Sequence, residues 1–326
     1  MILGNQLPLD NVIYRYQLKG DGHVSSISAD DSPTKEAPFW LHADLNNEVF
    51  ITWLKTTPLL SDALKEVFFS DNSRPSIHRF TEGTVIILRC IDDKAKDYQE
   101  GLLVIRIFIS ETLIISTRDK PIKAIDMLNN NIIHQDGPTD SCDWLIDLGD
   151  ELTEQLRICV ENIHEEKIDK LEELVLDEEL PEQGQLASVR KELIMLRRYL
   201  LPQRDVFSRL AIEKTSWMDS ADMVRIKELS ERVGRVLEDI DAAVARTMII
   251  SDEIKMLIGQ TTNKRMYIMS LLAMLFLPLT FLTGLLGVNL GGIPGEDSDI
   301  AFASFCLVIL VISIVLGWLL RKSDWL

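Results

Sequence analysis

The sequence is poor in cysteine and histidine, and neither type occurs in a spacing that binds a metal. Its four cysteines form no CxxC pair, and its five histidines form no HxxxH or HExxH site. We therefore expect reduced thiols in a cytosolic compartment, with Cys306 packed inside a membrane. No nucleophile and base pair, phosphate loop or paired catalytic site stands out either. The sequence therefore argues against an enzyme and predicts no bound cofactor.

Basic residues are also scarce, with 34 Lys and Arg against 51 Asp and Glu and a net charge of -17. Such a chain repels nucleic acid, which we exclude as a partner, and it suits a protein that handles cations, although acidic cytosolic proteins are common. The first 17 residues have neither the basic start nor the apolar core of a signal peptide. We therefore expect the part of the chain before residue 260 to lie in the cytoplasm.

Two stretches lack charge altogether. Residues 267–295 contain no Asp, Glu, Lys, Arg or His, and a helix over 267–286 is long enough to cross the ~30 Å hydrocarbon core of a bilayer. A second charge-free run covers 300–320. The sequence therefore predicts a two-span membrane domain over 266–326, with the lipid bilayer as a partner.

The charges beside the two spans predict their orientation. Four basic residues flank the spans on one side: Lys264, Arg265, Arg321 and Lys322. The charges of the connecting loop, 287–299, are all acidic: Glu296, Asp297 and Asp299. By the positive-inside rule both termini are cytoplasmic and the loop lies outside.

The N-terminal region, 1–145, reads as an α/β layer domain. Runs rich in branched residues predict strands at 40–42, 84–90, 102–110 and 112–116, the last two forming a hairpin. Helices are expected over 57–69 and 120–133.

Residues 146–202 read as an antiparallel helical hairpin, broken at Pro181 and Gly184 and ending near Pro202. Its tip is rich in carboxylates, of which Glu161 and Glu165 are four residues apart. A charge run of this kind is usually a solvated helix face, and the alternative is a loose site for divalent cations.

A stalk region, 203–265, leads into the membrane. Apolar residues keep a heptad spacing from Ile226 to Thr261, which predicts one helix from about Asp222 to Leu286, about 100 Å long. The apolar stripe must be buried, either on the preceding hairpin or on copies of itself around a symmetry axis.

Glycines crowd the outer end of the first span, together with Asn289. If several chains place this turn around one axis, its carbonyl and amide dipoles can bind a hydrated cation without stripping its water. The alternative is a helix C-cap, with Gly287 ending the span in the left-handed conformation and Asn289 bonding the loop.

The string Gly287-Val288-Asn289, after a long stalk helix and at the end of the first of two C-terminal spans, resembles the signature of the CorA superfamily of divalent metal-ion transporters. That family usually reads Gly-Met-Asn, often after Tyr, where this chain has Leu286 and Val288. The strings LPLTFLTGLLGVNLGGIPG, TTPLL and MLRRYLLPQRDV and the terminal Trp-Leu are similar to its zinc-transporting branch. The resemblance covers nearly the whole chain.

The resemblance implies a funnel-shaped homopentamer in a bacterial inner membrane, with the 287–299 loop in the periplasm. It implies uptake of Zn²⁺ coupled to protons as a symport, with Mg²⁺, Co²⁺, Ni²⁺ and Cd²⁺ as further candidate cargoes. Asn289, with the backbone of Gly287 and Val288, would form the outer selectivity ring, and the acidic loop residues Glu296, Asp297 and Asp299 would concentrate cations. The pore below would be lined by Gly284, Thr280, Leu277, Ala273, Met269 and Met266.

The residues themselves support only part of this implication. The spacing of three or four places the proposed pore residues on one helix face, where Leu277 and Met266 are candidates for hydrophobic constrictions. An apolar residue at any of these positions is equally consistent with a surface that faces lipid or another helix. The first span has no thiolate, imidazole or carboxylate to bind zinc or relay a proton. Two alternatives therefore stay open: a Mg²⁺, Co²⁺ or Ni²⁺ channel driven by the membrane potential, and a two-span anchored sensor or adaptor.

Overall fold

The computed structural model describes residues 11–26, 37–71, 73–92, 102–287 and 300–322. The chain divides into two compact units, Met1–Ser251 and Asp252–Leu326. One long helix, α7 (Ser220–Leu286), belongs to both units because it runs without a break through the boundary.

The first unit is built on one mixed sheet of seven strands, in the order β2-β1-β3-β7-β6-β5-β4. Only the β3 and β7 pair is parallel, and the predicted hairpin is confirmed as the antiparallel pair of β6 and β7. The strands are β1 (Tyr14–Leu18), β2 (Val24–Ser26), β3 (Phe39–Asp44), β4 (Ser76–Arg79), β5 (Thr84–Ile91), β6 (Leu102–Ile109) and β7 (Leu113–Arg118).

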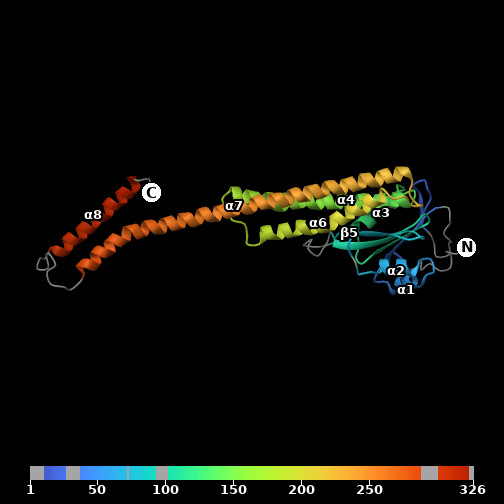
Figure 1. Ribbon diagram of the computed structural model, residues 1–326, viewed down its shortest axis with the longest axis horizontal. Coiled ribbons are helices and arrows are strands. Elements are labelled where there is room, and N and C mark those ends of the chain that lie inside the picture. The colour runs from blue at the N-terminus through green and yellow to red at the C-terminus, as the bar shows by residue number, and fades with distance from the viewer. Residues whose placement is uncertain (1–10, 27–36, 72, 93–101, 288–299, 323–326) are drawn as a thin grey trace. The chain divides into compact units, whose positions relative to one another are not determined.

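The sheet is covered on both faces, which explains why its central strands are apolar throughout. Along β5, Ile86 and Leu88 pack into one core and Val85 and Ile87 into the other, because successive side chains point to opposite faces. Helices α1 (Glu48–Thr56) and α2 (Asp62–Phe68) cover one face, and α3 (Lys123–Ile133) lies on the other (Figure 1). The predicted α/β layer domain is therefore confirmed.

Two details of this domain correct the sequence analysis. The helix expected from residue 57 begins at Asp62, and Thr57 instead ends α1, which was not predicted. Pro58 explains the break, because proline disfavours the helical conformation in the residue before it. The three short strands β1, β2 and β4 were also missed.

The predicted helical hairpin is confirmed in outline. Its first arm consists of α4 (Ser141–Ile163), a π-helical turn (His164–Ile168) and α5 (Asp169–Leu176), and its second arm is α6 (Gln185–Leu210). Gly184 precedes α6 with a left-handed φ of 89°. The predicted end near Pro202 is wrong, because α6 continues through the proline. Val206, Phe207 and Leu210 extend its buried stripe, and their packing outweighs the hydrogen bond that proline cannot make.

The heptad stripe of α7 is buried within the single chain as far as Ile250. Its residues Ile226, Leu229, Val233, Val236, Ile240, Ala243, Thr247 and Ile250 are all buried. They pack in the first unit, where the Ser208 and Ser230 hydroxyls are 2.7 Å apart and Arg190 Nη2 donates to the Thr247 carbonyl at 2.8 Å. Of the two predicted partners, the first unit, which contains the preceding hairpin, therefore covers the stripe up to this point.

Candidate functional site

Several carboxylates of the acidic hairpin are paired with basic side chains. Arg157 Nη1 donates to Glu161 Oε2 at 2.9 Å, and Arg157 also holds Glu154. Across the hairpin, Lys167 Nζ donates to the buried Glu192 carboxylate at 2.6 Å. Among the described residues, no group of three or more His, Cys, Asp or Glu side chains could hold a metal ion. This arrangement favours the solvated helix face over a cation site.

A cluster around Arg246 fastens α7 to the hairpin. The guanidinium donates to Glu172 Oε1 at 3.0 Å and to Asp169 Oδ1 at 2.9 Å, and its Nη1 lies 3.1 Å from His164 Nδ1. The Glu172 hydrogen bond raises the pKa of Arg246. Arg246 lies five residues before the end of the first unit at Ser251, so these contacts fix the stalk helix close to the point where it leaves that unit.

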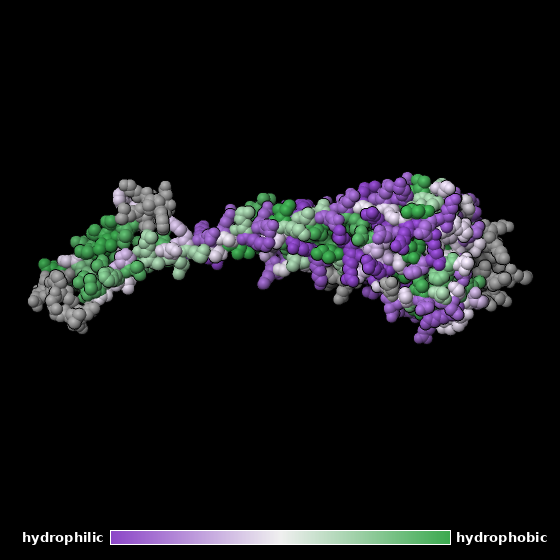
Figure 2. All heavy atoms as spheres, viewed as in Figure 1, coloured by the Kyte–Doolittle hydropathy of each residue, from purple (hydrophilic) through white to green (hydrophobic). Residues whose placement is uncertain are grey.

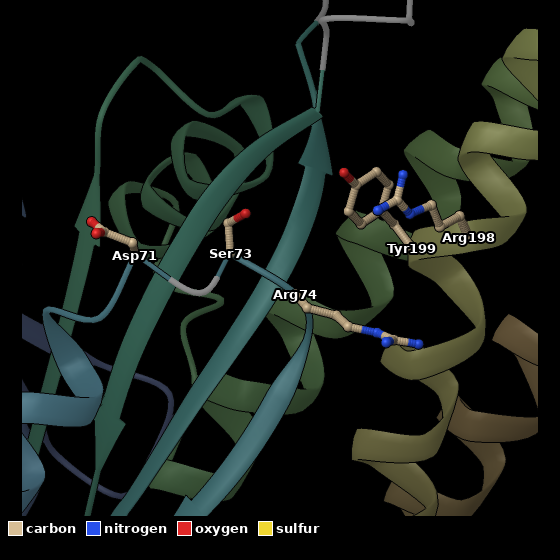
Figure 3. Close-up of a pocket in the computed structure, with 5 residues that line it drawn as sticks. All are labelled: Asp71, Ser73, Arg74, Arg198 and Tyr199. Carbon is tan, nitrogen blue, oxygen red and sulfur yellow. The ribbon is translucent and has the colours of Figure 1, made fainter.

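A polar pocket of about 320 Å³ lies between the loop before β4 and α6 (Figure 3). It is lined by Asp71, Ser73, Arg74, Arg198 and Tyr199. The Arg89 guanidinium sits 4.6 Å from the Tyr199 ring centroid. A lining with two guanidinium groups and one carboxylate is unsuited to a divalent cation, so this pocket is not a metal site.

Three buried titratable groups of the first unit keep one protonation state around neutral pH. His42 Nδ1 lies 2.8 Å from Ser116 Oγ, and burial lowers the pKa of His42 to about 3. Burial also raises the pKa of Cys90 to about 12 and raises the pKa of Cys142. The histidine therefore stays neutral and the thiols stay protonated.

The second unit contains the apolar helices. The last part of α7 is long and apolar enough to cross a membrane, whereas the apolar stretch within α8 (Ala301–Lys322) covers Phe302–Trp318 among the described residues. Figure 2 shows mostly apolar side chains over α8 and the end of α7, whereas the surface of the first unit is largely polar.

The end of α7 has two distinct faces. At 3.6 residues per turn, the six residues predicted to line a pore fall within an arc of about 80°. All six are exposed: Met266, Met269, Ala273, Leu277, Thr280 and Gly284. The half-buried residues fall on the opposite side: Leu271, Leu275, Pro278, Leu279 and Leu282. The predicted residues thus lie in the middle of the exposed part of this helix, which also includes the bulky side chains of Leu272, Phe276 and Phe281 on either side of them.

The second helix has a matching covered face. Its half-buried residues recur every three or four positions: Phe305, Ile309, Ile312, Ser313, Leu316 and Gly317. Each of the two helices of this unit thus has a half-buried side and an exposed side.

The outer end of α7 is held by regular helical bonds. Thr280 Oγ1 donates to the Phe276 carbonyl at 2.8 Å, and the Gly287 N–H donates to the Thr283 carbonyl at 2.9 Å. A Cβ on Gly287 would lie 2.8 Å from that carbonyl oxygen, so any larger residue would force the backbone to shift. The φ of Gly287 is not left-handed, which contradicts the left-handed ending that the sequence offered as one part of the alternative cap. Val288, Asn289, Glu296, Asp297 and Asp299 lie outside the described residues.

Sequence reasoning missed the Arg246 cluster and the pocket at Tyr199. Both join residues that are far apart in the chain, and no local spacing signals them. The heptad spacing signalled only that α7 has a buried side.

Comparison with known proteins gives one consistent relationship. The zinc transport protein ZntB of Yersinia enterocolitica is 44% identical over 326 residues, which is 100% of this chain and 99% of that protein. The zinc transport protein ZntB of Pectobacterium carotovorum is 43% identical over 323 residues, 99% of this chain and 98% of that protein.

Solved structures agree on the architecture. The full-length CmaX protein matches with a TM-score of 0.81 at 29% identity, covering 96% of this chain and 98% of that chain. The CorA magnesium transporter of Methanocaldococcus jannaschii matches with a TM-score of 0.84 over 96% of this chain and 99% of that chain. Its identity of 16% makes this a likeness of fold alone. Residues 35–322 match the model of the CorA-like Mg²⁺ transporter protein family, and the chain belongs to that family.

Proposed function

We propose that the chain is a zinc transporter that carries Zn²⁺ across the bacterial inner membrane. We infer Zn²⁺ as the substrate because the relatives that align with the chain from end to end are named zinc transport proteins. The structural observation that carries the proposal is the row of six exposed residues on α7 from Met266 to Gly284, which combines small, polar and flexible side chains and lies opposite the half-buried side of the helix. A face of this kind suits the wall of a pathway.

The pathway forms between copies of the chain. One α7 cannot enclose a pore by itself, and the side that would face the axis is the exposed side, opposite the half-buried residues. In the proposed homopentamer, five α7 helices surround the axis and five α8 helices lie outside them. Two spans with basic flanks at Lys264, Arg265, Arg321 and Lys322 then place both termini in the cytoplasm.

The chemistry of the face requires the ion to keep most of its water in the outer half of the pathway. Gly284 and Leu277 bring no heteroatom, and Thr280 uses its hydroxyl proton within the helix, so only oxygen lone pairs face outward. Asn289 beyond Gly287 is proposed as the outer ring, with Glu296, Asp297 and Asp299 attracting cations to it. Coupling to protons, if it occurs, must use groups away from this face.

The test is cation uptake into liposomes that contain the purified protein, read by an internal zinc dye with and without an inward proton gradient and compared with Mg²⁺. Two threonines on the last turns of α7 provide a matched pair, because each donates its hydroxyl to a helix carbonyl: Thr280 to Phe276 and Thr283 to Thr280. Only Thr280 lies on the proposed pore face. Thr280→Val should reduce zinc flux, and Thr283→Val should not.

Each other outcome selects an alternative. Preferred flux of Mg²⁺, driven by the membrane potential, would make the chain a general divalent-cation channel of the family. No flux of either ion would favour a two-span membrane sensor or adaptor. Equal effects of the two threonine substitutions would contradict the assignment of the pore face.

A further inference from the structure

Two methionines stand one helical turn apart at the inner end of the exposed face. The side chain of Met266 is 57% exposed and that of Met269 is 68% exposed. Residues three apart on a helix are neighbours on its surface, so the two thioethers lie next to each other. They lie on the same face as Thr280 and Gly284, opposite the half-buried side.

The thioether sulfurs are the only soft donor atoms on this face between Met266 and Gly287. Ala273, Leu277 and Gly284 have no side-chain heteroatom, and the Thr280 oxygen is a hard donor. Methionine is unbranched and turns about three side-chain bonds, so its sulfur can point either along the helix or outward from it. An aliphatic side chain would close a hydrophobic constriction equally well, but it could not offer a ligand to an ion.

The candidate cargoes, Zn²⁺, Cd²⁺ and Mg²⁺, differ in how readily they bind sulfur ligands rather than oxygen ligands. Sulfur ligands favour zinc and softer cations, whereas Mg²⁺ takes oxygen ligands and gives up its water reluctantly. We propose that Met266 and Met269 of each chain form a thioether ring at the inner end of the pathway that contacts Zn²⁺ and Cd²⁺ and so favours them over Mg²⁺. This inference rests on the proposed pore and adds to it the residues that set the preference.

The ring differs in a measurable way from a hydrophobic constriction. Leucine has nearly the volume and apolar character of methionine but has no sulfur. Met266→Leu/Met269→Leu therefore keeps the constriction and removes the donors. Met274 provides the control, because it is an exposed methionine of the same helix, 44% accessible, that lies outside the pore face.

The experiment measures initial rates of Cd²⁺, Zn²⁺ and Mg²⁺ uptake into liposomes with the full-length protein. In Met266→Leu/Met269→Leu, the ratio of Cd²⁺ to Mg²⁺ uptake should fall about fivefold, which corresponds to about 1 kcal/mol of lost preference. The ratio of Zn²⁺ to Mg²⁺ uptake should fall less, because zinc is the less soft ion. Met274→Leu should keep both ratios of the parent.

The outcomes separate this inference from the proposed function. Uptake with unchanged ratios in the double variant would overturn the thioether ring and leave the zinc transporter intact. An equal fall in Met274→Leu would also overturn the ring. If the parent carries no cation at all, the proposed function fails and the ring fails with it. If size-exclusion chromatography shows that the double variant does not assemble, Met266→Leu and Met269→Leu are measured separately. Each should lower the ratio of Cd²⁺ to Mg²⁺ uptake by less than the double variant, and unchanged ratios in both would overturn the ring.

Discussion

The contacts of Arg246 are predicted to hold the stalk helix on the first unit. Its guanidinium reaches two carboxylates of the first arm of the hairpin, Asp169 and Glu172, and binds Glu172 through two nitrogens. Substitution by glutamine removes the charge and leaves the two carboxylates unpaired. The stalk helix should then be less firmly attached at the point where it leaves the first unit.

The magnitude follows from the exposure of the three side chains. Arg246 is 35% exposed, Glu172 34% and Asp169 48%, so water screens both ion pairs. Screened pairs contribute at most about 1 kcal/mol each, and the two-nitrogen geometry places the Glu172 pair at the upper end of that range. Arg246→Gln should therefore cost about 1–2 kcal/mol, which lowers the melting temperature of a unit of this size by about 2–8 °C.

The assay is thermal denaturation of the full-length protein in detergent, followed by near-ultraviolet circular dichroism. Arg157→Gln is the matched control, because Arg157 also holds two carboxylates but both belong to its own helix, α4. It should change the melting temperature little. In 1 M NaCl, where the Debye length is about 3 Å, the effect of Arg246→Gln should shrink. The reasoning is refuted if the two variants melt alike, or if high salt leaves their difference unchanged.

Three further predictions address the membrane end and the pH dependence. In Gly287→Ala, the new Cβ would stand 2.8 Å from the Thr283 carbonyl oxygen, so the last turn of α7 must shift and zinc flux should fall; flux equal to the parent would contradict this. Asn289→Ala should abolish zinc flux into liposomes while the assembly elutes unchanged, whereas a lost assembly would indicate a structural cap. Burial raises the pKa of Asp147 from 3.8 to about 6, so ionisation of this carboxyl destabilises the fold as the pH rises from about 4 to about 6. Asp147→Asn should therefore melt above the parent at pH 8 and lose that advantage at pH 4, and an advantage independent of pH would count against the assignment.

Much of the second unit was predictable because its signals are local. A membrane span is a long run without charge, and a helix of this length is a sustained spacing of apolar residues. The predicted start of α7 at about Asp222 and its end at Leu286 agree with the helix Ser220–Leu286. The resemblance at Gly287-Val288-Asn289 also needed nothing beyond the order of residues, although the ring it implies stays a prediction.

The first unit was less predictable at its edges. Strands β1 and β2 are short and alternate only weakly, so their identity depends on the neighbours with which they pair. Helix α6 runs through Pro202, against the local preference of proline, because tertiary packing of Val206 and Phe207 decides the outcome.

The sequence by itself therefore determined which segments are apolar, where the long helix runs and to which family the chain is similar. Only the tertiary structure decided that β3 pairs in parallel with β7, that the stripe of α7 is buried as far as Ile250, and that the exposed face at Thr280 lies opposite the covered one. The physical reason is that charge and periodicity are carried by residues close in the chain. Pairing, burial and exposure depend instead on contacts between residues far apart in it, such as the 74 positions that separate Glu172 from Arg246.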